Sequence, residues 1–330
     1  MAIRSTGFLI ASALAFAGFT PDINAHAQGA SWPERTVTIV VPFAPGGGTD
    51  VLARMMGKEL EQKTGKTFVI ENRPGAGGTI GAQAVTRAAP DGHTIFLGSG
   101  TNLAVNVSLY KKLAYDPVKE FVPLALAAAT PFVLVVNPSL PVKNVQDLIN
   151  YVKERPGQLN YASSGAGVPH HLFMELMASM TGLKMTMVPY KGSAPALNDV
   201  IAGHVPLMMV DIGPALGSIQ GGKVRALGVT TAQRVATVQD VPSLSETLPG
   251  FDAAGWFMFA GPSAMPPSVT AKIHATMDEV LAKPEFGAAL IKFGLIPQKN
   301  RPVEALKAFM VEEIERWRKV VRTAGVEGKF

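Results

Sequence analysis

Cysteine is absent from this chain of 330 residues, and its absence removes several possibilities at once. Without thiols the protein has no disulfide framework and no thiolate metal site. It also lacks a cysteine that could carry a lipid anchor after the N-terminal segment. Stability must therefore come from hydrophobic cores, and the length is ample for two lobes, because domains usually contain about 100–200 residues.

A membrane-spanning run is absent as well. The N-terminal apolar run, residues 8–19, is shorter than the roughly 20 residues that a spanning helix needs. It follows Arg4 and precedes a small-x-small cleavage site that ends at Ala27, a pattern typical of a secretory signal peptide. We therefore expect a signal peptide over residues 1–27, a mature chain that starts at Gln28, and a location in the periplasm.

Basic runs are missing too, although Lys and Arg outnumber Asp and Glu and the formal net charge is +5. The basic residues are scattered and are not interleaved with aromatic ones, so nucleic acid is not an expected partner. Small anions suit this modest positive charge better. The alternative is that these charged residues only form a solvated surface and bind no partner.

What is present is an alternation of short β-rich segments with amphipathic helical segments, which predicts an α/β fold with a mostly parallel sheet. The expected strands are 37–41, 68–70, 94–97, 132–136, 159–161, 185–188, 207–210 and 226–230. The expected helices are 51–64, 80–88, 145–154, 171–180, 195–202, 215–221, 267–282 and 302–324.

No Ser/Gly-type linker divides the chain, so a second lobe should be inserted into the first rather than follow it. The expected crossover segments are 125–129 and 250–256. The first lobe would then comprise residues 28–125 and 250–330, and the second residues 126–249.

The sequence PFAPGGGTD, residues 42–50, lies between an expected strand and an expected helix. Glycines permit a tight turn and close approach of a ligand, and the unpaired N–H groups of a helix start suit a carboxylate or phosphate. Thr49 or Asp50 could cap the helix. The pattern is neither a P-loop nor a dinucleotide fingerprint. A simple strand-to-helix turn is the alternative.

A second glycine-rich turn, SSGAG at residues 163–167, precedes a helix that should start near His170. Two such helix starts in separate lobes could hold the two ends of one small acid. Each charge-assisted hydrogen bond contributes roughly 1.5–3 kcal/mol, so a few suffice for micromolar binding.

The same residues also suggest two other kinds of site, a hydrolase triad and a metal site. Ser163 or Ser164, His170 or His171, and Asp211 would form a hydrolase triad, but the G-x-S-x-G elbow is absent. His171 and Glu175 share a helical face, yet two ligands without a third are weak support for a metal site. Asp211 could instead cap the helix that follows it, and Trp256 could lie at the hinge, line the cleft or pack in the core. We expect no metal and no cofactor.

The motifs PFAPGGGTDVLAR, ENRPGAGGTIGA, PDGHTIFLG, YASSGAG, VPYKG and GKVRALGVTTAQR occur in the order seen in a known family. The chain resembles the substrate-binding proteins of tripartite tricarboxylate transporters, the Bug family, over nearly all of its mature length. The resemblance implies a periplasmic-binding-protein type II-like fold, with two α/β lobes, a ligand cleft and a hinge. It also implies a non-enzymatic, monomeric protein that binds a small carboxylate and delivers it to membrane transporter subunits.

The resemblance also implies site residues. The first loop matches the family loop that holds a ligand carboxylate, the second matches the opposing loop, and the segment 98–102 matches a cleft edge. The implied ligand-binding residues are Phe43, Gly47, Gly48, Thr49, Asp50, Ser99, Thr101, Ser163, Ser164, Gly165, Gly167, Val168, His171 and Asp211. Val168 departs from the Ser or Thr frequent in relatives, which favours a ligand with an apolar or aromatic middle.

These observations predict a periplasmic solute-binding protein that closes on a mono- or dicarboxylate, aromatic acids included. Two alternatives stay open at this point: a secreted esterase or other hydrolase of small acids, and a binding protein that reports its ligand to a receptor kinase. The sequence does not identify the acid.

Overall fold

The computed structural model describes residues 1, 2, 32–323 and 325–329. The predicted signal peptide therefore lies almost wholly outside the described residues, as does the predicted mature N-terminus, Gln28. Within the described part of the chain, no helix combines the length and apolarity needed to cross a membrane.

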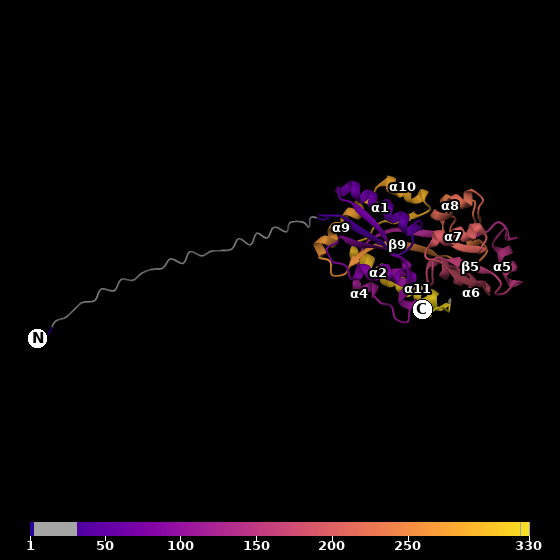
Figure 1. Cartoon of the computed structure of the whole chain (residues 1–330), viewed down its shortest axis with the longest axis horizontal. Coiled ribbons are helices and arrows are strands. Elements are labelled where there is room, and N and C mark those ends of the chain that lie inside the picture. Colours follow the sequence, from indigo (N-terminus) through magenta and orange to yellow (C-terminus); the bar gives the residue numbers. More distant parts are fainter. Residues whose placement is uncertain (3–31, 324, 330) are drawn as a thin grey trace.

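The chain folds into two α/β lobes that lie side by side (Figure 1). The sheet of the first lobe has the strand order β2-β1-β3-β9-β4, and β10 also pairs with β4. The bounds of these strands are β1 Val37–Val41, β2 Phe68–Asn72, β3 Thr94–Ser99, β4 Phe121–Val136, β9 Ala254–Pro262 and β10 Ile296–Pro297. Figure 1 shows that the early (indigo) and late (orange to yellow) parts of the chain share this lobe.

The second lobe is built on the far end of β4. From Phe132 onward, β4 pairs with β7 and β8 instead of β9. The other strands of this lobe are β5 Asn160–Ser163, β6 Thr186–Pro189, β7 Leu207–Asp211 and β8 Arg225–Val229. Strand β9 runs antiparallel to β4 up to the pair Ala254–Pro131, so the two strands cross between the lobes together. The boundaries at residues 125 and 250 remain a prediction, and β4 changes its strand partner between Pro131 and Phe132.

The expectation of a mostly parallel sheet is wrong. Only the pairs β1–β2, β1–β3, β5–β6 and β5–β7 are parallel, whereas β4 is antiparallel to β7, β8, β9 and β10, and β9 is antiparallel to β3. The missed strands are β9, the first part of β4 and the two-residue β10, and the first two are buried along nearly their whole length. Strands covered on both faces show no polar alternation, so these alanine- and phenylalanine-rich runs gave no period-two signal.

Helices cover both sheets. Those of the first lobe are α1 Gly48–Thr64, α2 Thr79–Thr86, α3 Asn106–Leu109, α4 Pro117–Glu120, α9 Pro267–Leu281, α10 Pro284–Lys292 and α11 Val303–Thr323, with a π-helical turn at Thr101–Val105. Those of the second lobe are α5 Val145–Lys153, α6 Pro169–Thr181, α7 Ser193–Ala202 and α8 Ile212–Gln220. All eight expected helices occur, and α3, α4, α10 and the π-helical turn are additions.

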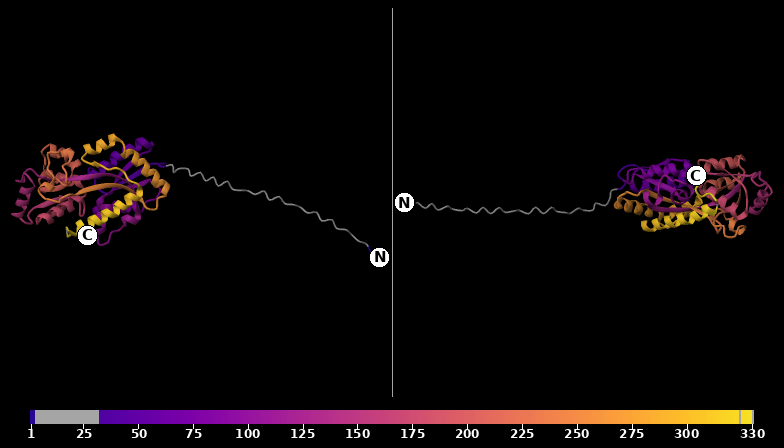
Figure 2. Two further views of the ribbon diagram at one scale, coloured as in Figure 1. Left: turned by 180° about the vertical axis from the view of Figure 1, so that it is seen from behind. Right: turned by 90° about the horizontal axis from the view of Figure 1, so that it is seen from below.

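Helix α11 joins the lobes. It runs along the first lobe and ends near the junction with the second (Figure 2). The ring of Trp317 stacks on Phe173 of α6, with centroids 5.9 Å apart. The buried carboxylate of Glu313 accepts hydrogen bonds from the indole N–H of Trp317 at 2.9 Å and from that of Trp256, on β9, at 2.6 Å. A buried carboxylate needs such donors, and they fasten α11 to the crossing strands.

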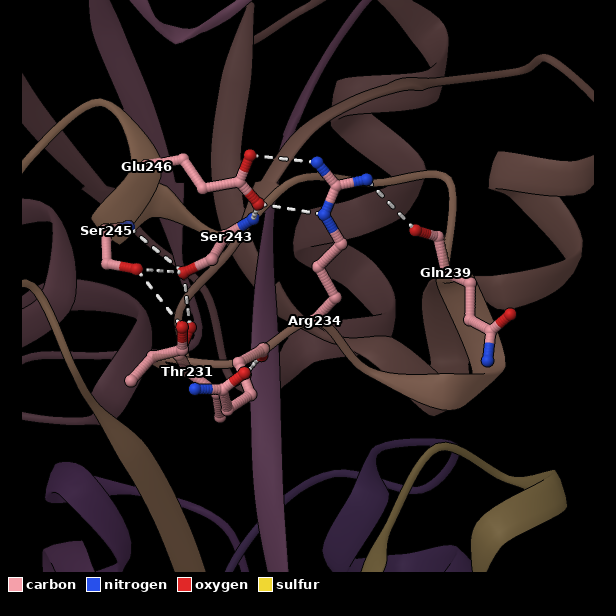
Figure 3. A network of polar contacts seen from close by, with 8 residues as sticks. Thr231, Arg234, Gln239, Ser243, Ser245 and Glu246 are labelled. Atoms are coloured by element: carbon pink, nitrogen blue, oxygen red, sulfur yellow. Dashed lines mark hydrogen bonds and ion pairs between the residues drawn. The ribbon is translucent and has the colours of Figure 1, made fainter.

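The chain returns from the second lobe through a segment fixed by a polar network (Figure 3). Ser243 and Glu246 form a capping box, and Arg234 binds both carboxylate oxygens of Glu246 at 2.8 Å. The hydrogen bond from Arg234, with that from the Ser243 N–H, lowers the pKa of Glu246 to about 2. The network holds the loop that leads the chain from β8 back to β9.

Candidate functional site

A small cavity lies between the lobes, where the strand ends of both sheets face each other. Its volume is about 40 Å³, and one water molecule requires roughly 10–15 Å³. A group the size of a carboxylate therefore fits the cavity as it stands. The lining residues are Phe43, Gly47, Gly48, Thr49, Ser99, Thr130, Phe132, Ser164, Val168, Pro169, His170, Ser193, Asp211, Gly255, Trp256 and Phe257.

The first glycine-rich loop ends in α1, which begins at Gly48 with Gly47 as its N-cap and no side-chain cap. The expectation that Thr49 or Asp50 caps the helix is therefore wrong. The Asp50 carboxylate instead accepts hydrogen bonds of 3.0 Å from the Gly46 N–H, from Asn72 and from Arg54. Burial alone would raise the pKa of Asp50, but these bonds outweigh it and lower the pKa. Asp50 thus shapes the loop from behind the cavity.

The N-terminus of α1 is met by a carboxylate of the protein itself. Asp211, at the end of β7 in the second lobe, accepts a hydrogen bond of 3.1 Å from the Gly48 N–H and one of 3.2 Å from the Ser193 hydroxyl. Asp211 immediately precedes α8 but its side chain does not cap that helix, so the capping alternative is wrong. Burial raises its pKa, whereas the contacts with His170 and Gly48 lower it, and the net shift is downward.

The second glycine-rich loop is also satisfied internally. The Gly167 N–H donates to Nδ1 of His171 at 3.0 Å, and the Gly165 N–H donates to the Ser163 hydroxyl at 3.3 Å. The N–H groups of Gly46, Gly48, Gly165 and Gly167 therefore have acceptors within the protein. The expectation that the glycine-rich loops leave these N–H groups unpaired is wrong. Buried amides rarely remain unpaired, and here neighbouring side chains supply the acceptors.

A chain of polar contacts crosses the cavity wall. The Ser164 hydroxyl lies 2.9 Å from Nδ1 of His170, and Nε2 of His170 lies 3.0 Å from Oδ1 of Asp211. The His170 ring packs edge-on against Phe132, with centroids 5.1 Å apart. The contact between Nε2 and Asp211 is close but poorly aligned, since Nε2 forms no well-directed hydrogen bond with any described residue.

The Thr130 hydroxyl, on the crossing strand β4, has unused hydrogen-bonding capacity. Thr130 is 2% exposed, and among the described residues its hydroxyl oxygen has no hydrogen-bond partner. It lies on β4 opposite Gly255 of β9 and lines the cavity. Because a buried hydroxyl without a partner costs free energy, Thr130 is the group best placed to bond a ligand oxygen.

The structure brings eight of the implied site residues to the cavity: Phe43, Gly47, Gly48, Thr49, Ser99, Ser164, Val168 and Asp211. Gly165 lines a neighbouring, more open chamber. The remaining five line neither space: Asp50, Thr101, Ser163, Gly167 and His171. Their ligand-binding role stays a prediction, and their contacts point to support of the loops.

Sequence reasoning left out Thr130, Phe132, Pro169, Ser193, Gly255 and Phe257, and weighed His170 and Trp256 only as alternatives. These residues reach the cavity because β4, β9 and the α7 start meet there in space. One signal was available: Thr130 is the only polar residue in the run from Phe121 to Val136.

A metal site finds no support in the described residues, which contain no group of three or more candidate ligands. Nε2 of His171 lies 3.9 Å from the Glu175 carboxylate, and that carboxylate accepts a hydrogen bond of 2.6 Å from Tyr161. The pair is thus part of the packing beneath the second loop.

Two lobes crossed by paired strands, with a cavity between opposed helix starts, define the class of two-lobed periplasmic binding proteins. The chain belongs to the tripartite tricarboxylate transporter receptor family, whose model matches residues 52–326. Members of this family, the Bug proteins among them, are periplasmic substrate-binding proteins.

Individual relatives agree along nearly the whole chain. BugT of Bordetella pertussis is 34% identical over 312 residues, which cover 94% of this chain and 95% of BugT. The structure of R. palustris Rpa4515 with adipate is 37% identical, with a TM-score of 0.87 over 90% of this chain and 99% of that one. MatC (Rpa3494) from Rhodopseudomonas palustris with bound malate is 36% identical, with a TM-score of 0.83 over 88% and 100%. These similarities confirm the predicted fold class and family.

Proposed function

We propose that this protein captures a small carboxylate between its two lobes in the periplasm and delivers it to the membrane subunits of a tripartite tricarboxylate-type transporter. One observation carries the proposal: a cavity of carboxylate size lies between the lobes, and the hydroxyl of Thr130 on its wall has no hydrogen-bond partner among the described residues. The membership of the family supports it. So do two similar structures, Rpa4515 with adipate and MatC with bound malate.

The cavity can hold an anion although Asp211 lines it. The Asp211 carboxylate is already bonded by Gly48, Ser193 and the adjacent His170. Its negative charge is therefore partly compensated inside the protein. The Thr130 hydroxyl on the cavity wall has no partner among the described residues and can donate to the carboxylate of a ligand.

Two hydrogen bonds connect the lobes and form only when the lobes lie next to each other, as in a closed protein. Asp211 binds Gly48, and the Ala44 N–H donates to the Lys191 carbonyl at 3.2 Å, each time across the lobe boundary. A ligand that bonds both walls adds to these contacts and shifts the population toward the closed form.

A thermal-shift screen over C4 to C8 dicarboxylates, matched monocarboxylates, citrate and aromatic acids tests the proposal, with calorimetry on each acid that stabilises the protein. The expected result is saturable stabilisation by at least one acid, since binding at 100 times Kd contributes about 2.7 kcal/mol. If none of these acids stabilises the protein, the proposed function is wrong. Uptake of the identified acid by cells that contain the transporter subunits, with and without this protein, tests delivery.

Hydrolysis is the second candidate, because the contacts of Ser164, His170 and Asp211 follow the order of a catalytic triad. Two observations weigh against it: the His170–Asp211 contact is poorly aligned, and the Asp211 carboxylate also serves Gly48 and Ser193. Release of nitrophenol from short-chain esters, lost in Ser164→Ala, would support hydrolysis. We expect no ester turnover, and reduced ligand affinity in Ser164→Ala.

A further inference from the structure

A second chamber opens directly outside the cavity. Phe43 and Ser164 line both spaces, so the two spaces adjoin. The outer chamber is much larger, with a volume of about 460 Å³ against about 40 Å³ for the cavity. The outer chamber is therefore the neighbouring space with room for the remaining atoms of a ligand longer than one carboxylate group.

One wall of the outer chamber is the loop Gly75–Gly78 of the first lobe. The carbonyls of this loop accept hydrogen bonds from side chains beneath it: Asn102 donates to Gly77 at 3.0 Å and Tyr110 donates to Ala76 at 2.8 Å. A side chain at Gly77 would collide with the Tyr110 hydroxyl at 2.9 Å. The loop is thus held in one position and presents a wall without bulky side chains.

The opposite wall belongs to the second lobe and is largely apolar. It consists of Gly165, Ala166, Pro189 and Tyr190. The Phe43 ring lies where the two spaces join. This lining suits a hydrocarbon or aromatic spacer, because apolar surface gains free energy when it is buried.

Lys191 is the one charged residue among the described residues that line this chamber. Its side chain is exposed, and it forms no ion pair with any described residue. Its main chain is fixed, because its carbonyl accepts the hydrogen bond from Ala44 across the lobe boundary. The Lys191 ammonium group thus extends from a fixed main-chain position on the lining of a largely apolar chamber that adjoins the cavity.

We propose that the outer chamber is a subsite for the second acidic group of the ligand, and that Lys191 recognises it. This inference rests on the proposed function and narrows the ligand to dicarboxylates with an apolar spacer. The first carboxylate occupies the cavity near Thr130 and His170, the spacer lies between Phe43 and Tyr190, and the distal carboxylate meets Lys191.

Calorimetry on matched acids tests this assignment. Hexanedioate and octanedioate are compared with hexanoate and octanoate on the wild type, on Lys191→Met and on Lys153→Met. Lys153 is an exposed lysine at the end of α5 and serves as the control. For the dicarboxylates we expect Lys191→Met to weaken binding about three- to tenfold, as for a partly exposed ion pair. The monocarboxylates should bind both variants as they bind the wild type, and added salt should reduce only the preference for dicarboxylates.

Equal losses for mono- and dicarboxylates in Lys191→Met would overturn the assignment, because they would show that Lys191 only supports the loop. Unchanged dicarboxylate binding in that variant would overturn it as well. Both outcomes leave the proposed function standing. If no acid binds the wild type, the proposed function itself fails, and this inference fails with it.

Discussion

The Asp211 carboxylate of the second lobe accepts a hydrogen bond of 3.1 Å from the Gly48 N–H, at the first turn of α1 in the first lobe. An internal carboxylate therefore takes the helix-start position that the sequence suggested for a ligand anion. The same oxygen accepts from Ser193, and the other lies 3.0 Å from His170. The contact between Asp211 and Gly48 links the lobes and holds a carboxylate at the cavity wall.

Asp211→Ala should destabilise the protein by about 2–4 kcal/mol, because it leaves the buried Gly48 N–H and His170 without their acceptor. Urea unfolding measures this loss. Small-angle scattering should also show a larger radius of gyration, since the lobes lose a shared contact. Asp240→Ala, at an exposed position, is the control and should stay within about 0.5 kcal/mol of the wild type. Wild-type stability and size in Asp211→Ala would show that the contact does not link the lobes.

Thr130→Val should weaken carboxylate binding about fivefold or more without a loss of stability. The hydroxyl has no partner among the described residues, so its replacement by a methyl group removes no internal hydrogen bond. Thr230→Val is the matched control, since the buried Thr230 hydroxyl accepts from the Phe132 N–H at 3.0 Å. That variant should lose about 1–2 kcal/mol. Calorimetry and urea unfolding separate the two effects, and an unchanged affinity in Thr130→Val would remove Thr130 from the site.

Stability should fall as the pH is lowered from about 6.5 to about 4. Burial, and secondarily the charge of Lys329, lower the pKa of His171 to about 4, against an ordinary value near 6.5. The unfolded chain then binds the proton first, so acid favours unfolding by up to about 1.4 kcal/mol per pH unit in this window. Protonation of Nδ1 would also remove the acceptor of the Gly167 N–H.

Urea unfolding at several pH values measures this effect in the wild type and in His171→Asn, whose side-chain oxygen can replace Nδ1 as acceptor. The variant should lose most of the dependence between pH 6.5 and 4. The lowered pKa values of Asp50 and Asp211 act in the same direction but at lower pH: their stabilising contributions are present above about pH 4 and are lost below it. An equal slope in His171→Asn would show that other groups cause the effect.

Gly47→Asp should abolish ligand-induced thermal stabilisation. A Cβ atom at Gly47 would lie 2.8 Å from the Ser193 hydroxyl oxygen across the lobe boundary, and the Asp side chain would add a carboxylate to the cavity that Asp211 already lines, so the variant should oppose closure on an anion. Gly165→Asp should act similarly, because Gly165 has φ +142, which other residues rarely adopt. Gly217→Ala, in α8 with open space around it, should leave stabilisation unchanged. Normal stabilisation of Gly47→Asp by the cognate acid would contradict closure on the ligand.

Most elements of the fold could be predicted from local pattern. The strand Val37–Val41 is confirmed to the residue, and all the expected helices occur. The failures share a cause: Phe121–Pro131 and Ala254–Pro262 are buried on both faces and lack alternation. These two segments form the antiparallel strands that cross between the lobes. Because they were not predicted, the sheet was expected to be mostly parallel.

The candidate site was predictable only where one segment carries it. Gly47, Gly48, Thr49 and Ser164 follow strands and precede helices, which is a local signal. Thr130 and Ser193 enter the cavity through tertiary packing, and no local pattern reports that. Local pattern also could not predict the internal acceptors of the glycine N–H groups. Asp211, for example, lies 163 residues from Gly48 in the sequence.

A crystal structure with the acid that most stabilises the protein tests the central claim most directly. We predict a carboxylate between the lobes, with its oxygen atoms within hydrogen-bonding distance of the Thr130 hydroxyl and of Nε2 of His170. A carboxylate bound outside the cleft, or a cation in the cavity, would contradict the account.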